Sequence, residues 1–215
     1  MKLFIARHGE SVANIQNIIQ GQLNYGLSER GIKEAKLLAE YLRDEQFNCI
    51  YSSDIKRVEQ TVNEIKKYHD IPVMQDKIFR EAYLGRFEGC THDEIALKYP
   101  EHADTDWMSS GLPDVEQIDK VYERALNSVK LILNRHKIGE KALLVSHGGY
   151  ISSIFAALLN IPWTGKKPFS IQNTSISIID FTDPKQFVVL SVNETPHLNK
   201  EMRKNLTKPV DLKKQ

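Results

Sequence analysis

Short apolar runs alternate along this chain with longer segments whose apolar residues recur at helical spacing. Residues 3–6 and 142–145 are continuous apolar runs that end at polar residues or glycine, which is typical of buried strands. Residues 48–51 and 72–74 are predicted as two shorter strands, and Ser28 is expected to cap the first helix. Helices are predicted from apolar spacing at residues 28–42, 58–65, 121–133 and 151–159.

The alternation of predicted strands and helices indicates an α/β fold with three layers, in which helices cover both faces of a mostly parallel sheet. Residues 175–181 and 187–192 are β-rich and are expected to pair through a turn at Asp183-Pro184. Residues 90–115 fit the alternation poorly. They are predicted to form a small helical excursion that covers the rim of the sheet.

The predicted domain organisation is simple. A chain of 215 residues is long enough for one sizeable core, and the pattern shows no internal repeat and no linker rich in Gly, Pro or Ser. We therefore expect one domain over residues 1–198, followed by a basic, solvated tail over residues 199–215.

Charge and cysteine content limit the partners and the compartment that we expect. The net charge is +1, so nothing in the overall charge suggests a nucleic-acid partner. Cys49 and Cys90 have no metal-ligand or redox spacing, which favours a reducing cytoplasm. The first apolar stretch is too short for a signal peptide, and no apolar run is long enough to span a membrane, so no membrane partner is expected.

Polar residues collect where three predicted strands end. The first strand ends in Arg7-His8, the second is followed by Arg57 one turn into the next helix, and the third ends in His147-Gly148. Because ligands of parallel α/β sheets bind outside the carboxyl ends of the strands, these residues are expected to meet at one rim. Arginine pairs match the geometry of phosphate oxygens, so the cluster predicts a phosphate site.

Such a cluster could transfer a phosphoryl group. A neutral imidazole can attack phosphorus in line, while the two arginines and the second histidine stabilise the phosphoryl oxygens. A departing alkoxide also needs a proton from a nearby carboxylic acid. The best candidate is Glu81 and the rival is Glu88, and spacing alone does not separate them. No metal or other cofactor is required, and no pair of residues has a zinc or magnesium pattern.

Four short motifs of this chain resemble those of the histidine phosphatase superfamily, which is also called the phosphoglycerate mutase-like family. RHGES at residues 7–11 with Asn14 resembles its signature, and SSD at residues 52–54 with Arg57 and Thr61 resembles its second motif. RE at residues 80–81, followed by LGRFEG at residues 84–89, resembles the acid-bearing motif of the family. SHGG at residues 146–149 resembles its last motif.

The resemblance implies a role for each matching residue. His8 is expected to be the phosphorylated nucleophile, and Glu81, rather than Glu88, the proton donor. The expected phosphate pocket consists of Arg7, Asn14, Arg57, His147 and the backbone of Gly148.

One loop departs from the family pattern. Residues 20–27 keep the Gly and Leu of the pattern but carry Asn24 and Gly26 where the family often has Asp and Pro. Because this loop tends to contact the substrate, Gln20 and Gly21 are expected to bind it, and the identity of the substrate is left open.

The expected activity is hydrolysis of a small phosphomonoester through phosphohistidine. The segment around Glu81 looks like the phosphatase branch of the family, and the acidic and aromatic excursion suits a monoester better than a second phosphate. The alternatives are a cofactor-dependent phosphoglycerate mutase and a non-catalytic phosphate-binding module.

A nucleotide-binding P-loop is not expected, because residues 164–167 (TGKK) lack the upstream glycine of that motif. Candidate substrates are a sugar phosphate, phosphoglycerate, α-ribazole phosphate or a broad mixture.

Overall fold

The computed structural model describes residues 1–183 and 186–204, and its centre is a six-stranded sheet in the order β3-β2-β4-β1-β5-β6. The strands that run parallel to one another are β1 (Lys2–Arg7), β2 (Cys49–Ser52), β3 (Val73–Gln75) and β4 (Lys141–Ser146). The antiparallel strands at one edge are β5 (Ile176–Asp183) and β6 (Gln186–Glu194). The predicted α/β class and the pairing of the last two β-rich segments are therefore confirmed, while Pro184 of the expected turn lies outside the described residues.

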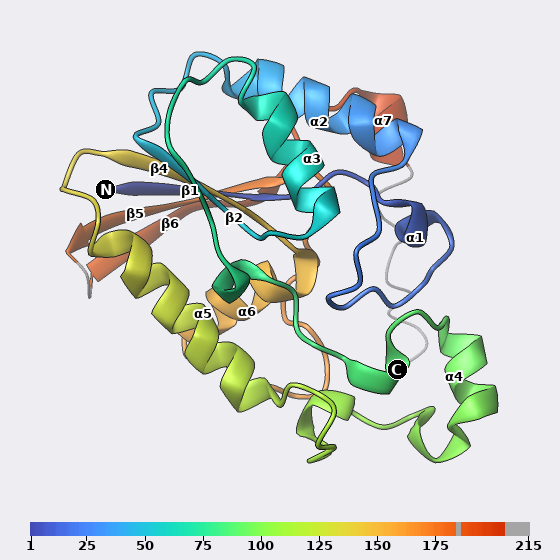
Figure 1. Ribbon diagram of the computed structural model, residues 1–215. Coiled ribbons are helices and arrows are strands. Elements are labelled where there is room, and N and C mark those ends of the chain that lie inside the picture. The colour runs from blue at the N-terminus through green and yellow to red at the C-terminus, as the bar shows by residue number, and fades with distance from the viewer. Residues whose placement is uncertain (184–185, 205–215) are drawn as a thin grey trace.

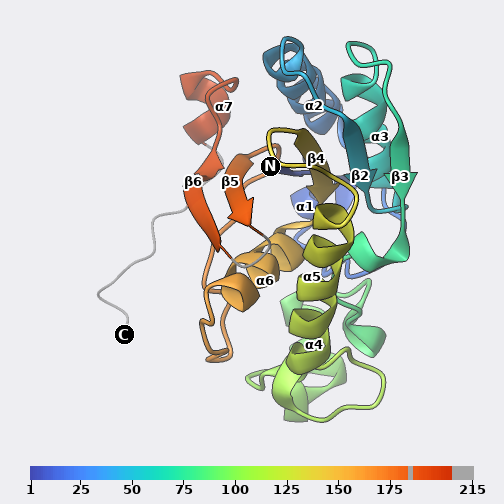
Figure 2. The same ribbon diagram turned by 90° about the vertical axis from the view of Figure 1, so that its left-hand side faces the viewer.

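Helices cover both faces of the sheet, as predicted, and Figures 1 and 2 show the resulting layers. One face carries α2 (Glu29–Leu42) and α3 (Lys56–Ile65), and the other carries α5 (Ile118–Leu133) and α6 (Gly148–Leu158). In β1, Phe4 packs toward α2 and α3 while Leu3 and Ile5 pack toward α5 and α6. Because both faces are buried, this strand reads as a continuous apolar run rather than as an alternating one.

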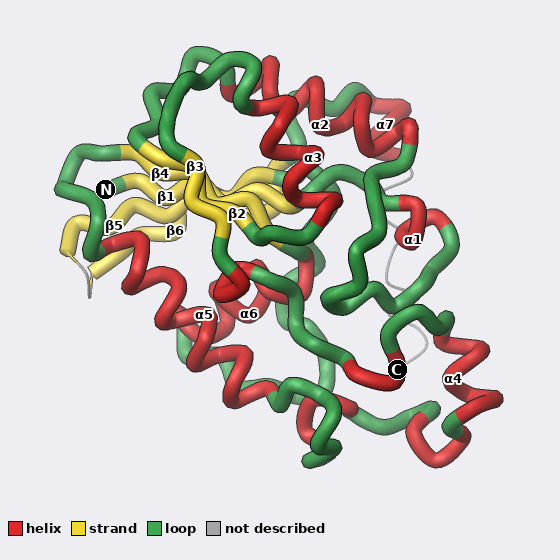
Figure 3. Tube along the Cα trace, in the orientation of Figure 1, coloured by secondary structure: helices red, strands yellow, loops and turns green. Residues whose placement is uncertain are grey.

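Strand register brings the carboxyl ends of β1, β2 and β4 together. Arg7 at the end of β1 pairs with Ser146 at the end of β4, and Ser52 at the end of β2 pairs with Val145. The residues that follow these strands therefore lie along one edge of the sheet. Figure 3 shows the loops that gather there, on the side of α1 (Val12–Ile15).

The excursion that the sequence predicts forms a small layer of its own beyond this edge (Figure 1). Its helical elements are α4 (His92–Lys98), η3 (Pro100–His102) and η4 (Trp107–Ser109), and two short 3-10 turns precede it, η1 (Lys77–Phe79) and η2 (Gly85–Phe87). The excursion has a separate apolar cluster in which the ring of Trp107 stacks on Phe87 with 4.3 Å between centroids.

The C-terminal stretch differs in part from the solvated tail that we expected. Lys200–Lys204 form α7, which lies beside α2 (Figure 1). Arg30 Nη2 of α2 donates a hydrogen bond to the carbonyl of Met202 over 2.7 Å. The first turn of the expected tail is therefore bonded to the domain, and residues 205–215 lie outside the described residues.

No helix in the described part of the chain is long and apolar enough to cross a membrane.

Candidate active site

A cavity of about 800 Å³ lies at the carboxyl edge of the sheet, between the strand ends and the excursion. Of the residues predicted from the sequence, the cavity is lined by Arg7, His8, Asn14, Gln20, Gly21, Arg57, Glu81 and Gly148. His147 lies behind this wall, fully buried, with its ring centroid 5.3 Å from that of His8. The structure thus brings together side chains that the sequence places at separate strand ends.

The hydrogen-bond partners of His8 define its tautomer. Its Nδ1 atom lies 2.7 Å from the carbonyl oxygen of Gly9, and Arg57 Nε donates to its Nε2 atom over 3.2 Å. Because a carbonyl only accepts and a guanidinium only donates, Nδ1 carries the hydrogen and Nε2 carries the lone pair. Burial, reinforced by the charges of Arg57 and Arg7, lowers the pKa of His8 well below its ordinary value. The imidazole is therefore neutral near pH 7.

Arg57 joins His8 to the loop over residues 20–24. It stands in the first turn of α3, is 1% exposed, and donates from Nη1 to the carbonyl of Leu23 (2.7 Å) and from Nη2 to that of Gly21 (2.8 Å). Burial lowers the pKa of Arg57 to about 10, so the group stays charged at neutral pH. Gly21 has φ +45°, and a Cβ there would lie 1.9 Å from the Glu88 carboxylate. The loop geometry thus requires glycine at this position.

Two buried donors of the site lack partners among the described residues. They are Arg7 Nε and His147 Nδ1. The Nη1 atom of Arg7 is already engaged, because it donates to the carbonyl of Ile171 over 2.6 Å. An unpaired buried polar group costs about 1–3 kcal/mol, and a bound anion with several oxygens would remove that cost.

The proton on His147 can be placed from its neighbours. Ser53 Oγ accepts a hydrogen bond from the backbone N–H of Ile55 (3.3 Å), so its own hydrogen can go to His147 Nε2, which lies 2.9 Å away. Burial, then the charges of Arg57 and His8, lower the pKa of His147 well below its ordinary value. In the neutral ring the remaining hydrogen is on Nδ1, the unpartnered atom.

The two candidate acids occupy different environments. Glu81 lines the cavity, and its carboxylate accepts from the backbone N–H of Gly149 (2.9 Å) and of Ala82 (3.1 Å). Glu88 instead accepts from the backbone N–H groups of Gln22 and Leu84, both over 2.9 Å. Glu88 therefore ties two loops together, whereas Glu81 is placed where a proton donor could reach a bound ester.

Asn14 and Gln20 line the same cavity as His8. The Oδ1 atom of Asn14 accepts from the backbone N–H of Ser11 over 3.0 Å, in the capping box that starts α1. The hydroxyl of Ser11 donates to Gln20 Oε1 over 2.8 Å. Since both amide oxygens are engaged, the amide N–H groups are the atoms left to meet an anion in the cavity.

Sequence reasoning did not identify Arg124 as part of this site. Arg124 of α5 donates from Nη1 to the carbonyls of Ile78 (2.9 Å) and Arg80 (2.7 Å), and it pairs with Glu116 over 2.8 Å. It therefore holds the segment that carries Glu81. No local motif marks it, because Arg124 lies 43 positions from Glu81 along the chain.

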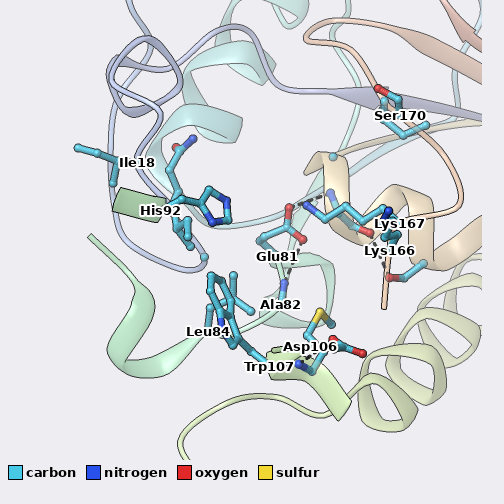
Figure 4. A pocket seen from close by; sticks show the side chains of 18 of the residues that line it. Ile18, Glu81, Ala82, Leu84, His92, Asp106, Trp107, Lys166, Lys167 and Ser170 are labelled. Carbon is cyan, nitrogen blue, oxygen red and sulfur yellow. Dashed lines mark hydrogen bonds between the residues drawn. The ribbon is translucent and has the colours of Figure 1, made fainter. Parts of the chain in front are cut away.

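The outer walls of the cavity were also missed. They come from the excursion and from the loop between α6 and β5, and Figure 4 shows Trp107, Asp106, Lys166 and Lys167 around the opening. The indole Nε1 of Trp163 donates to Asp106 and so joins the two segments. Within the described residues no cluster of three or more His, Cys, Asp or Glu side chains could hold a metal ion.

The sequence and the fold of this chain are similar to those of known proteins. A family profile described as "Histidine phosphatase superfamily (branch 1)" matches residues 3–195. "Phosphoglycerate mutase-like protein 4" of Arabidopsis thaliana is 31% identical over 205 residues, which cover 92% of this chain and 86% of that protein. "Phosphoserine phosphatase 1" of Hydrogenobacter thermophilus is 32% identical over 202 residues, covering 92% and 94%. The solved structure "Bacillus stearothermophilus YhfR" is similar with a TM-score of 0.84 at 32% identity, covering 91% of this chain and 98% of that one.

Proposed function

Because this chain belongs to branch 1 of the histidine phosphatase superfamily, we propose that it is a phosphatase that hydrolyses small phosphomonoesters through a phosphohistidine on His8. The observation that carries the proposal is the floor of the cavity. There a neutral, buried His8, whose Nε2 lone pair accepts from Arg57 Nε, lies in a site whose buried donors Arg7 Nε and His147 Nδ1 have no partner among the described residues. A phosphoryl group would satisfy both donors and meet the nucleophile.

In the first half-reaction His8 Nε2 attacks phosphorus, the N–P bond forms and the P–O bond to the alcohol breaks. Arg7, Arg57 and His147 stabilise the phosphoryl oxygens, and the protonated carboxyl of Glu81 gives its proton to the leaving oxygen. In the second half-reaction Glu81 takes a proton from water, whose oxygen attacks phosphorus. The N–P bond breaks, and inorganic phosphate leaves a neutral His8.

The charge stabilisation in this scheme comes from Arg7, Arg57, His147 and backbone N–H groups, so the proposed activity is independent of metal ions. Arg57 keeps its charge, and Arg7 places a second guanidinium at the same site. We expect EDTA to leave turnover unchanged. Loss of activity in EDTA that magnesium or zinc restores would contradict this part of the proposal.

The experiment for the whole proposal combines a substrate panel with a chemical trap. Purified protein is assayed for phosphate release from phosphoserine, 3-phosphoglycerate, sugar phosphates and p-nitrophenyl phosphate. Rapid quenching in denaturant should recover phosphate that is acid-labile and base-stable, as expected for phosphohistidine, on His8. Label on Ser11, Ser53 or Ser146 would overturn the mechanism.

A mutase activity is the competing possibility, since one similar protein is named phosphoglycerate mutase-like. A mutase transfers the phosphoryl group of His8 to a substrate hydroxyl, whereas a phosphatase transfers it to water. Incubation of 3-phosphoglycerate with and without 2,3-bisphosphoglycerate separates the two. We expect release of inorganic phosphate in both conditions, and isomerisation that requires the bisphosphate would favour the mutase.

A further inference from the structure

The loop between α6 and β5 adds positive charge to a cavity whose floor is already basic. Lys166 and Lys167 of this loop line the cavity, and neither ammonium group has a hydrogen bond or ion pair with any described residue. Figure 4 shows both lysines among the residues that line the cavity, together with Glu81, Ile18 and His92. These lysines belong to the segment that lacked the glycine spacing of a nucleotide-binding loop.

The carboxylates that line the cavity form no ion pair with the lysines in the described residues. Glu81 accepts from the backbone N–H groups of Gly149 and Ala82. Asp106 accepts from the indole of Trp163 and, over 3.2 Å, from the backbone N–H of Met108. Both carboxylates thus have partners of their own, and neither forms an ion pair with Lys166 or Lys167 in the described residues.

The basic side chains of the cavity fall into two sets, one at the floor and one in the α6–β5 loop. Four basic side chains line the cavity, Arg7, Arg57, Lys166 and Lys167, together with the two carboxylates. A phosphate monoester carries about −1.5 to −2 charges at pH 7, and the arginines of the floor are placed to bind it. Lys166 and Lys167, which form no ion pair with the described residues, then remain to meet a second anionic group, and positive charge that lines a cavity raises the local concentration of anions.

The lysine loop is anchored on both sides rather than free. Before the lysines, the indole of Trp163 bonds to Asp106 of the excursion. After them, the backbone N–H of Phe169 donates to Ser152 Oγ of α6 over 3.2 Å, and the carbonyl of Ile171 accepts from Arg7 Nη1 over 2.6 Å. The same arginine that faces the phosphate site therefore positions the end of this loop.

We propose that Lys166 and Lys167 bind a second anionic group on the alcohol part of the substrate. The preferred substrates are then phosphomonoesters that carry a carboxylate or another phosphate, and Lys166 and Lys167 determine that preference. The inference rests on the proposed function for the phosphoryl end of the substrate. A cavity of about 800 Å³ accommodates a small molecule that reaches from the floor to this loop.

The test compares substrates that differ only in the second anion. Phosphoserine is matched with phosphoethanolamine, which lacks the carboxylate, and fructose 1,6-bisphosphate is matched with fructose 6-phosphate. In the variant Lys166→Gln/Lys167→Gln we expect kcat/KM to fall about 10-fold for the doubly anionic member, mainly through KM, because exposed ion pairs contribute modestly. The member without the second anion should change less than about 2-fold. A selective loss of kcat/KM in the first pair would show that the lysines bind a carboxylate. A selective loss in the second pair would show that they bind a phosphate.

The matched control is Lys33→Gln/Lys36→Gln on the exposed side of α2. It removes the same number of charges, and neither lysine has an ion pair or hydrogen bond with the described residues. This variant should keep the wild-type ratio for both pairs. A ratio that falls as far as in the Lys166/Lys167 variant would show that general charge, and not the lysine loop, sets the preference, and would overturn the inference.

Two further outcomes also overturn the inference without touching the proposed function. They are equal loss for both members of each pair, and no loss for any substrate while wild-type protein still hydrolyses p-nitrophenyl phosphate. If wild-type protein turns over no phosphomonoester, the proposed function fails, and calorimetric binding decides the inference separately. Binding of 3-phosphoglycerate, compared with glycerol 3-phosphate, should weaken about 10-fold in the double lysine variant, and unchanged binding would reject the role of the lysines.

Discussion

The floor and the mouth of the cavity are built from different parts of the fold. The floor consists of Arg7, His8 and Arg57, with His147 behind it, and these residues stand at or soon after the ends of buried strands and are themselves largely buried. The mouth consists of side chains from the excursion and the α6–β5 loop, where Lys166 and Lys167 are exposed.

The floor is held by many short hydrogen bonds to the backbone. Arg57 alone donates to two loop carbonyls and to His8, so its guanidinium has little freedom. The mouth is joined mainly through the indole of Trp163 and Asp106. This difference suggests a division of roles, in which the floor carries out the phosphoryl transfer and the mouth selects the alcohol. The following predictions test whether that division holds.

The largest expected effect is on the floor. His8→Ala removes the atom that forms the N–P bond, and loss of a covalent nucleophile costs at least about 10⁴-fold in turnover. We expect this loss in kcat on every substrate, including those that differ at the mouth, with a thermal unfolding transition that stays cooperative. His69→Ala is the control, because His69 is a buried histidine that packs on Phe47 away from the cavity. Activity of His8→Ala within 10-fold of wild type would contradict the nucleophile assignment.

A second large effect depends on the leaving group. Glu81→Gln cannot donate the proton that a basic alkoxide needs, so kcat/KM should fall by roughly 100- to 10,000-fold for an alkyl phosphate. A nitrophenolate leaves without such help, and p-nitrophenyl phosphate should lose much less. The measurement is the ratio of kcat/KM for the two substrates, which reports the phosphorylation step.

Two controls test that assignment. Arg57→Ala should lower kcat/KM for alkyl and aryl substrates alike, because in the proposed mechanism Arg57 stabilises the phosphoryl group that they share. Glu88→Gln should weaken the two loops that its carboxylate joins and also affect both substrates alike. If Glu88→Gln gave the selective loss and Glu81→Gln did not, Glu88 would be the acid.

The buried histidines of the floor predict a pH dependence of stability. Burial lowers the pKa of His8 and His147 well below their values in the unfolded chain, which lie near 6.5. Below about pH 6.5 the unfolded state therefore binds protons at these histidines while the native state does not, so the free energy of unfolding decreases as the pH falls. Each such histidine contributes about 1 kcal/mol per pH unit between pH 6 and 5.

The measurement is urea unfolding at several pH values. His8→Gln should show a shallower decrease of unfolding free energy between pH 6 and 5 than wild type, by about 1 kcal/mol per pH unit. An identical slope in both proteins would show that His8 titrates normally in the folded state and is not held neutral by its surroundings.

The smallest expected effect is at the mouth. Trp163→Phe keeps the ring but removes the hydrogen bond to Asp106, which should lower stability by about 1 kcal/mol and raise KM by less than about 5-fold. We expect kcat on p-nitrophenyl phosphate to stay unchanged, since the floor does not depend on this bond. A fall of kcat of more than about 10-fold would show that the floor and mouth are coupled and would break the division between them.

Much of the floor could be predicted because its determinants are local. The apolar run of β1 and that of β4 each end in an imidazole, and parallel pairing places such ends at one edge. Ser28 caps α2 as expected, since its side chain accepts from the backbone N–H of Gly31 over 2.9 Å. The assignment of Glu81 over Glu88 was different. That assignment came from the family resemblance and not from spacing. The distinct surroundings of Glu81 and Glu88 depend on the backbone path of two loops.

The amino-acid pattern by itself determined the α/β class, the strands that carry Arg7 and His8, and the chemical types that meet at the sheet edge. A strand that is buried on both faces requires a continuous run of apolar residues, and such a run can be recognised from neighbouring positions in the sequence. Only the tertiary structure decided that Arg124 supports the acid segment, that Lys166 and Lys167 enter the cavity wall, and that Asn199–Lys204 return to α2. The physical reason is that these arrangements depend on hydrogen bonds between residues distant in the chain, which no local spacing encodes.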